Sequence, residues 1–505
     1  MPSIFWLSVT DKCVDKGIME TFFWHDYETW GVNPALDRPS QFAAIRTDAN
    51  LNEIGEPIMI YAKPPRDALP HPEAALVTGI TPQYADEKGV IEAQFIAQIH
   101  QEMMQPNTCS VGFNSLRFDD EVTRFTLYRN FHDAYEREWK SGNSRWDIID
   151  VMRLCAALRP EGMVWPQDEE GIPVYKLETF TAANGIEQEG AHDALVDVRA
   201  TIDVARMIKS KQPGLYDYAL TMRNKRTVLD VLAIGQDKPI FHISSMFGSK
   251  NFCASVVLPL CMHPTNKNEV ICFDLRNSPK DFLALSVDDI RERVFSSNAA
   301  LAELAIDKGE AEIERIAIKS IHINKCPMVM VASRKLLSDE IASRIHLNMD
   351  EIAQHYQQLL EHKDSWHKAS DIFHGREFAP RTDPDTLLYG GGFFSPQDKQ
   401  QMQQVIQMSG AALEHQTFSF KDPRLPEMLF RYRARNFPEY LSAQEQLQWR
   451  QFCQARIADK NAGASIVLDE YQQQLRVLWQ ERPEKRALLQ ALNDWGVYLL
   501  EKRQA

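Results

Sequence analysis

The chain has 505 residues, which is too many for one ordinary hydrophobic core and predicts two or three domains. Hydrophobic residues make up 44% and charged residues 25%, as in soluble globular proteins, and no apolar run approaches the ~20 residues that span a bilayer. The formal net charge of −14 argues against a protein that coats nucleic acid generally. It does not exclude an enzyme with one basic channel, because phosphates respond to the local field.

The cysteines and the start of the chain bear on the cellular compartment. The eight cysteines are scattered and none forms a CxxC pair, so we expect reduced thiols in a cytoplasmic protein rather than disulfides or a zinc site. The opening segment lacks a basic stretch followed by an apolar one, which does not favour a secretory signal. We expect residues 1–18 to be disordered or to precede the true start, since Met19 begins the stretch METFFWHDYE.

The first part of the chain alternates short strands with turns and then with helices. Helical periodicity places Phe95, Ile99 and Met103 on one face. The expected strands cover 20–29, 41–48, 56–64 and 108–115, and the expected later helices cover 118–131 and 193–210. Three consecutive strands followed by alternating helices and strands predict an α/β layered domain, which we end near residue 212.

The composition and hydrophobic pattern of the sequence change twice after this domain. Five short β-rich pieces between 238 and 333, such as ASVVLPLCMH and EVICFDL, predict a small barrel or sandwich with helical insertions. From about residue 376 the chain is rich in Gln, Leu, Arg and Glu and is expected to be helical to its end.

Two acids leave the end of the first expected strand together. Asp26 and Glu28 are two residues apart, and residues i and i+2 of a strand point to the same face. Adjacent carboxylates repel each other unless a cation lies between them, and oxygen ligands suit Mg²⁺ or Mn²⁺. Taken alone, the pair is equally compatible with a solvated strand end.

Three further polar residues stand at helix starts or near the ends of expected strands. Asp119 follows Asn114 by five residues in NSLRFDDEV, and His192 precedes Asp197 by five residues in HDALVDV. A histidine and an acid at a helix start are usually explained by capping and solvent contact. Together with the first pair, however, they give four acids and one histidine at the places where α/β domains carry their sites.

The order of these motifs resembles the DEDD-type 3′→5′ exonucleases of the histidine subclass. DYETWG resembles the first motif of that superfamily, FNSLRFD the second and HDALVD the third. LVTGITP, which contains Thr78, matches a Thr-Gly-Ile segment that packs against the 3′-terminal nucleotide in these enzymes. Further stretches between residue 25 and about residue 438, among them RFDDEVTR, NSRWDIIDVMR, HINKCP and YRARNFP, resemble the bacterial exodeoxyribonuclease I family.

The resemblance implies an α/β multi-domain protein whose domains form a channel for single-stranded DNA. The implied units are a ribonuclease-H-like exonuclease domain (1–212), a small Src-homology-3-like β domain (213–375) and a helical C-terminal domain (376–505). Such a protein is expected to be a monomer in the cytoplasm, to act in DNA repair and recombination, and to have no membrane association.

The resemblance also assigns chemical roles to the five polar residues. Asp26, Glu28, Asp119 and Asp197 are expected to hold two Mg²⁺ ions, or Mn²⁺ in their place, ~3.5–4 Å apart around the last phosphodiester. His192 is expected to be the general base that takes the proton of the attacking water, so that a 5′-mononucleotide is released. We predict that Asp119 is the ligand and Asp120 is not, because neighbours on a helix point ~100° apart.

Around this centre the resemblance implies contacts to DNA that mix cations with aromatic rings. Cations pair with phosphates, and bases stack on the rings without sequence preference. Glu28 and Thr78 are expected at the terminal nucleotide. The other matching positions are Arg124, Tyr135, Trp139, Arg153, Tyr175, Lys176, Lys225, Asn268, Lys319, Asn324, Tyr389 and Phe393.

Two of these positions depart from the family pattern. The family often has arginine where this chain has Lys176, so a point charge replaces a bidentate phosphate clamp. The stretch YGGGFF is one glycine longer than usual, which makes the match of Phe393 less direct.

The stretch FRYRARNF (430–437) interleaves arginines and aromatic residues on an expected helix. It could form a solvated face, or contact DNA or an acidic partner segment. The family implies such a partner, the acidic C-terminal tail of single-stranded DNA-binding protein.

Two other functions remain open at this point. The catalytic residues alone cannot separate a DNA enzyme from an exoribonuclease or a proofreading exonuclease of the same superfamily, although the two extra domains favour the DNA enzyme. A non-catalytic single-stranded DNA-binding protein on the same fold is disfavoured, because all five catalytic residues are present.

Overall fold

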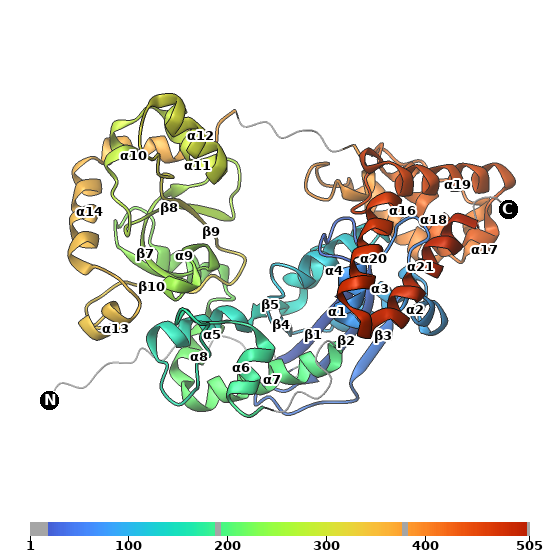
Figure 1. The fold of residues 1–505 in the computed structure, drawn as a ribbon, viewed down its shortest axis with the longest axis horizontal. Coiled ribbons are helices and arrows are strands. Elements are labelled where there is room, and N and C mark those ends of the chain that lie inside the picture. Colours follow the sequence, from blue (N-terminus) through green and yellow to red (C-terminus); the bar gives the residue numbers. More distant parts are fainter. Residues whose placement is uncertain (1–18, 187–192, 376–381, 502–505) are drawn as a thin grey trace.

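Two five-stranded sheets and a final group of helices organise the chain (Figure 1). The computed structural model describes residues 19–186, 193–375 and 382–501, so the expectation for residues 1–18 lies outside the described residues. Among the described helices, none combines the length and the apolar character that a membrane crossing needs.

The first sheet has the strand order β3-β2-β1-β4-β5, with β1 at its centre. Its strands are β1 (Thr21–Thr29), β2 (Pro39–Thr47), β3 (Ile58–Tyr61), β4 (Thr108–Gly112) and β5 (Ser144–Asp147). β2 is antiparallel to both β1 and β3, whereas β1, β4 and β5 are parallel to one another. The carboxyl ends of β1, β4 and β5 therefore meet at one edge of the sheet, where α/β sheets bind ligands.

Helices cover both faces of this sheet. The helices before the second sheet are α1 (Pro72–Thr78), α2 (Pro82–Lys88), α3 (Glu92–Met103), α4 (Asp119–Arg129), α5 (Ile148–Leu158), α6 (Leu177–Ala183), α7 (Ala194–Lys211), α8 (Pro213–Thr221) and α9 (Lys225–Leu232). α5 and α7 share a core with one face of the sheet, and α3 and α4 share a core with the other.

The alternation of side chains along β1 places two acids on the α7 side. Trp24 belongs to the core that β1 shares with α5 and α7, whereas Tyr27 belongs to the core shared with α3 and α4. Asp26 and Glu28 follow Trp24 at two-residue steps, so they lie on the same face as Trp24. The strand thus changes from apolar to acidic on one face only.

The second sheet is antiparallel and has the order β10-β6-β7-β8-β9. Its strands are β6 (Ile240–Ile243), β7 (Ala254–Met262), β8 (Glu269–Asp274), β9 (Ile318–His322) and β10 (Val329–Val331). The associated helices are α10 (Lys280–Ala284), α11 (Val287–Phe295), α12 (Asn298–Lys308), α13 (Asp339–Arg344), α14 (Met349–Glu361) and α15 (His367–Asp371). One hydrophobic core runs from α5, α7 and α8 into this sheet, so the first two units pack firmly together.

The last unit is helical and packs against the first unit on the side opposite the second sheet (Figure 1). Its helices are α16 (Pro396–Gln407), α17 (Gly410–His415), α18 (Leu425–Asn436), α19 (Ala443–Ala458), α20 (Leu468–Glu481) and α21 (Arg486–Glu501). α20 and α21 share a core with α1 and α2, and this core includes Ile80 of the Thr-Gly-Ile segment.

The arginines of α18 do not form the solvated or DNA-binding face considered from the sequence. Arg435 donates to the buried carboxylates of Asp67 and Asp385, at 2.8 and 2.6 Å. Arg431 pairs with Asp383 and Asp385. Both arginines are nearly inaccessible and have acidic partners in this same chain. Arg435 joins α18 to the first unit through Asp67, whereas the partners of Arg431 lie within the last unit.

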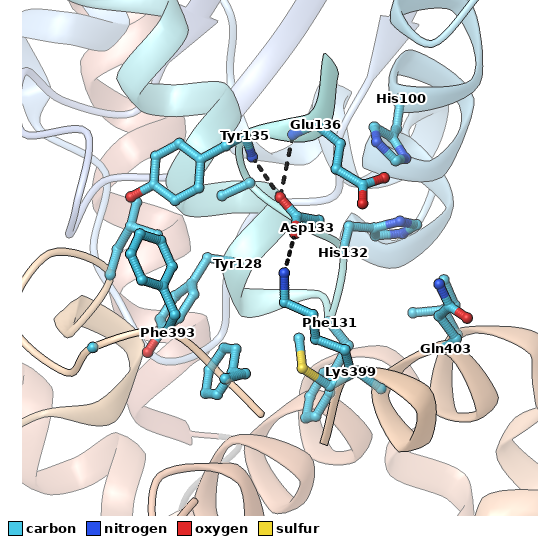
Figure 2. A pocket seen from close by; sticks show the side chains of 16 residues that line it. His100, Tyr128, Phe131, His132, Asp133, Tyr135, Glu136, Phe393, Lys399 and Gln403 are labelled. Atoms are coloured by element: carbon cyan, nitrogen blue, oxygen red, sulfur yellow. Dashed lines mark hydrogen bonds and ion pairs between the residues drawn. The ribbon is translucent and has the colours of Figure 1, made fainter. Parts of the chain in front are cut away.

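A cavity of about 140 Å³ lies where α16 meets the loop after α4 (Figure 2). At one end His100 and His132 pack edge to face, with ring centroids 4.9 Å apart. Burial lowers the pKa of His100 to about 4 and that of His132 to about 3. The charged groups around the pair are Asp133, Glu136, Arg137, Lys140 and Lys399.

This pair predicts that mild acid weakens the protein. In the unfolded chain both histidines bind protons near pH 6.5, whereas in the folded protein they stay neutral down to pH 3–4. The free energy of unfolding should therefore fall as the pH drops from about 6.5 towards 4, by a few kcal/mol for the pair at ~1.4 kcal/mol per pKa unit. Urea denaturation of the His100→Asn/His132→Asn protein should show a clearly shallower pH slope in this range. His415→Asn, at an exposed position, should leave the slope unchanged.

The three-part organisation expected from the sequence is confirmed. The strands expected at 20–29 and 41–48 and the helix expected at 193–210 agree with β1, β2 and α7 within two residues. The second unit has one sheet in the described residues, so the sandwich alternative is wrong. β5 was not predicted, because it has only four residues and no alternation to reveal it.

Candidate metal centre

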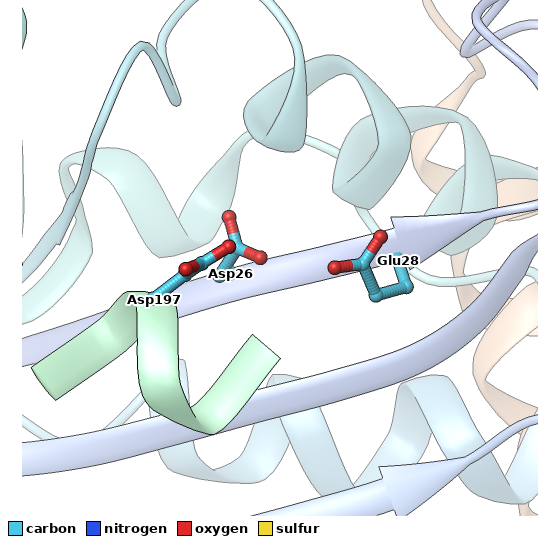
Figure 3. Close-up of side chains that lie close together, drawn as sticks. All are labelled: Asp26, Glu28 and Asp197. Carbon is cyan, nitrogen blue, oxygen red and sulfur yellow. The ribbon is translucent and has the colours of Figure 1, made fainter. Parts of the chain in front are cut away.

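Three carboxylates from two elements converge at the edge of the first sheet (Figure 3). Asp26 and Glu28 come from β1, and Asp197 comes from the first turn of α7. One oxygen of each lies within 4.8 Å of the oxygens of the other two. α7 packs across β1 and β2, and this packing brings Asp197 over the strand.

Burial and mutual repulsion raise the pKa values of the two acids of β1, Asp26 and Glu28. Burial, together with the charges of Asp197 and Asp119, raises the pKa of Glu28 to about 8. The pKa of Asp26 also lies well above its usual value, first because of burial and then because of Asp119, Glu28 and Asp197. Several negative charges at such short distances are costly without a compensating cation. The centre therefore fits a divalent ion with oxygen ligands.

Asp119 approaches the same centre from α4. Its Oδ1 accepts a hydrogen bond from the backbone N–H of Tyr27, which lies between the two acids of β1, at 3.0 Å. Burial raises the pKa of Asp119 to about 8. The neighbouring Asp120 points elsewhere and accepts from Arg137 and Arg145. The two acids therefore have different surroundings, as the helical geometry predicts.

A further acid, Asp147 at the end of β5, orders the loop before Asp119. Its carboxylate accepts from the backbone N–H groups of Asn114 at 2.8 Å and Leu116 at 3.2 Å, and it caps α5 through Ile149. Sequence reasoning missed this residue. The available signal was an acid at the end of a short strand followed directly by a helix, in RWDII.

The expected base, His192, lies outside the described residues. The next residue, Asp193, caps α7 by accepting from the backbone N–H of Leu195 at 2.9 Å. Its charge also contributes to the raised pKa of Glu28. Around the start of α7, the described chain thus brings two acids, Asp193 and Asp197, to this side of the centre.

Several of the expected DNA contacts are accessible on the surface. Trp139 is 65% exposed, Tyr389 57% and Phe393 88%. The Phe393 ring meets Tyr135 edge to face, with centroids 6.4 Å apart. Lys176 is exposed, and Lys225 donates to Asn268 at 2.6 Å. The exposed ring faces of Trp139, Tyr389 and Phe393 are accessible to bases.

Other expected contacts are engaged inside the protein. Arg124 is nearly inaccessible, and it donates to Glu138, Glu121 and Tyr389. Arg153 donates to Asp150 and lies over the buried ring of Tyr175.

The remaining expected contacts are half-buried. Thr78 accepts from the backbone N–H of Ile80 at 3.2 Å. In the second unit, the Lys319 amine lies 3.3 Å from the sulfur of Met246. The backbone carbonyl of Asn324 accepts from Arg145 at 2.9 Å.

Sequence profiles of three known domain families match the chain. The profile described as exonuclease matches residues 23–205, that of the exonuclease I SH3-like domain matches residues 223–375, and that of the exonuclease I C-terminal domain matches residues 382–499.

Similar proteins cover almost the whole chain. Exodeoxyribonuclease I of Haemophilus influenzae is 42% identical over 481 residues, which are 95% of this chain and 99% of that protein. Exodeoxyribonuclease I of Escherichia coli is 44% identical over 476 residues, which are 94% of this chain and 96% of that protein. A crystal structure of the zinc-bound E. coli ExoI complex with single-stranded DNA has a TM-score of 0.89 at 42% identity, covering 96% of this chain and 100% of that one.

Proposed function

Because the chain belongs to the exonuclease I family, we propose that it is a 3′→5′ exonuclease that hydrolyses single-stranded DNA to 5′-mononucleotides. The observation that carries this proposal is the convergence of Asp26, Glu28 and Asp197 within 4.8 Å, with Asp119 bonded to the backbone between the first two. Scattered surface acids would not gather, half-buried, at the ligand-binding edge of an α/β sheet.

The four acids fit divalent ions. All are carboxylates, which are hard oxygen ligands, and the raised pKa values of Asp26, Glu28 and Asp119 reflect a negative charge that a cation would neutralise. We propose Mg²⁺ as the native ion, with Mn²⁺ as a substitute. Two such ions would activate the attacking water and stabilise the leaving 3′-oxygen when bound.

The residues of the chain then have distinct tasks. The N–H of Tyr27 orients Asp119, and α7 holds Asp197 above β1. His192 is proposed to take the proton of the attacking water. The single-stranded DNA is proposed to stack its bases on exposed rings such as Trp139 and Phe393.

We also propose the wider setting that the family resemblance implies. The protein would act as a cytoplasmic monomer in DNA repair and recombination, and it would bind the acidic tail of single-stranded DNA-binding protein. Neither α18 arginine described above is available for this tail, because both are paired within the chain.

The first two acids of α4, Asp119 and Asp120, provide a specific prediction. Asp119→Asn should lower turnover by at least ~10²-fold with little loss of stability, because it changes a ligand of the centre. Asp120→Asn should instead lower the free energy of unfolding by ~3–5 kcal/mol, because it leaves Arg137 and Arg145 without their full partner. Turnover per folded molecule and urea denaturation of both variants would distinguish the roles. Full activity in Asp119→Asn with loss in Asp120→Asn would reverse the assignment.

The function is tested by degradation of single-stranded oligonucleotides labelled at either end. A DNA strand labelled at its 3′ end should release a labelled mononucleotide first, the reaction should stop in EDTA, and blunt duplex should be a poor substrate. Faster degradation of an RNA strand of the same sequence would indicate an exoribonuclease. Tight binding without cleavage at any metal concentration would indicate a binding protein.

A further inference from the structure

Three consecutive acids in the first turn of α4 face three different surroundings. Asp119 points to the metal centre, Asp120 to a pair of buried arginines, and Glu121 to the other two domains. Less than one helical turn separates the first acid from the third. A force that holds Glu121 in place therefore also holds Asp119.

The partners of Glu121 come from both outer domains. Its Oε2 accepts a hydrogen bond from the hydroxyl of Tyr389, in the segment that leads into the helical domain. Its Oε1 lies 3.7 Å from the amine of Lys325, in the loop between β9 and β10 of the second unit. The same loop supplies the carbonyl of Asn324, which accepts from Arg145 beside Asp120.

Glu121, Tyr389 and Lys325 form a junction between the three units, and Arg124 of the first unit also belongs to it. One nitrogen of its guanidinium donates to Glu121 at 2.7 Å and to the Tyr389 hydroxyl at 3.1 Å. Two others donate to both oxygens of Glu138, at 2.7 and 2.9 Å. Four of its donor contacts are thus made within the protein, which leaves little for a phosphate. In the structure, Arg124 therefore holds Glu121 in place.

The part of this contact network formed by Glu121 and Arg124 is largely removed from water. The side chain of Glu121 is 16% exposed and that of Arg124 5%, and the Tyr389 ring packs edge to face on Phe125 at 5.8 Å. Hydrogen bonds between charged groups in such a place are short and directional, and a partly satisfied network is costly. The junction therefore has one preferred geometry rather than a loose set of contacts.

We infer that Glu121 is a positioning residue, which holds the metal ligand Asp119 in place only when Tyr389 and Lys325 of the two outer domains are engaged. The inference rests on the proposed function, because it gives the outer domains a part in forming the metal centre. Tyr389 then acts through its hydroxyl, whatever contact its ring makes with a base. A shift of about 1 Å in such a group can cost ~10²-fold in rate, so a small displacement of the α4 turn is sufficient.

The Tyr389→Phe variant tests the inference, since it keeps the ring and removes only the hydroxyl. We expect its affinity for Mn²⁺, measured by calorimetry without DNA, to fall roughly 10-fold, and its kcat to fall about as much while KM for the strand is unchanged. Glu121→Gln should show the same changes, larger in size. The matched control is Glu136→Gln, which alters one ion pair with Lys140 at the surface and should behave as wild type.

The possible outcomes are distinct. Wild-type Mn²⁺ affinity and kcat in Tyr389→Phe would overturn the inference, as would a rise in KM alone, which would make the hydroxyl a DNA contact. A lower melting temperature with unchanged Mn²⁺ affinity would reduce the junction to a structural role and would also overturn it. Because Tyr389 is more than half exposed, this variant is expected to fold even if Glu121→Gln does not. An inactive wild type in the same assay would refute the proposed function instead.

Discussion

Replacing Asp26 with Asn is expected to remove nearly all nuclease activity and, at the same time, to stabilise the metal-free protein. Asp26 belongs to the group of carboxylates within 4.8 Å, and its pKa is raised by burial and by three neighbouring acids. Loss of a ligand that contributes several kcal/mol of transition-state stabilisation should lower turnover by at least ~10³-fold. The neutral amide also removes repulsion that the folded, metal-free protein must carry at neutral pH.

Thermal unfolding with and without divalent ion measures both effects. Wild type should gain melting temperature when Mg²⁺ or Ca²⁺ is added, because an ion that binds only the folded state stabilises it. Asp26→Asn should melt higher than wild type in EDTA and should gain little from the ion. Glu56→Gln, at an exposed acid on the loop before β3, serves as control and should respond to the ion as wild type does. A variant that is both less stable in EDTA and still stabilised by the ion would show that Asp26 is not a ligand.

The arrangement on β1 could be predicted because it depends on local geometry. Two-residue periodicity puts Asp26 and Glu28 on one face, and the helical pattern of 193–210 places Asp197 near a helix start. The structure shows these three together. What the periodicity could not give is the side from which α7 crosses the sheet, because this depends on the packing of α7 against β1 and β2.

Which groups the arginines contact could not be predicted from the sequence. Arg435 and its partner Asp67 are 368 positions apart, and Arg124 and Tyr389 are 265 apart. A basic residue beside aromatic rings has the same local pattern whether it meets a phosphate or a buried carboxylate. Only the tertiary fold decides between them. It gives Arg435 the carboxylate of Asp67, and it gives Arg124 the hydroxyl of Tyr389 beside the carboxylates of Glu121 and Glu138.

Replacing His192 with Ala should lower kcat by roughly 10²–10⁴-fold, the usual contribution of a positioned general base. Affinity for a single strand in Ca²⁺ should change little, because the proposed phosphate and base contacts lie on other residues. The choice of His192 rests on its place in the sequence: the next residue, Asp193, caps α7, and Asp197 in the first turn of that helix belongs to the group of three carboxylates.

The pH dependence of the reaction separates a base from a residue that only shapes the centre. Wild-type kcat should rise with pH as the base loses its proton, and His192→Ala should lose this limb of the profile. His415→Ala, at an exposed position on α17, should keep both the rate and the profile. A lower rate with the wild-type pH profile would mean that another group takes the proton. Asp193 would then be the first candidate, because it stands next to His192 and its charge already acts on Glu28.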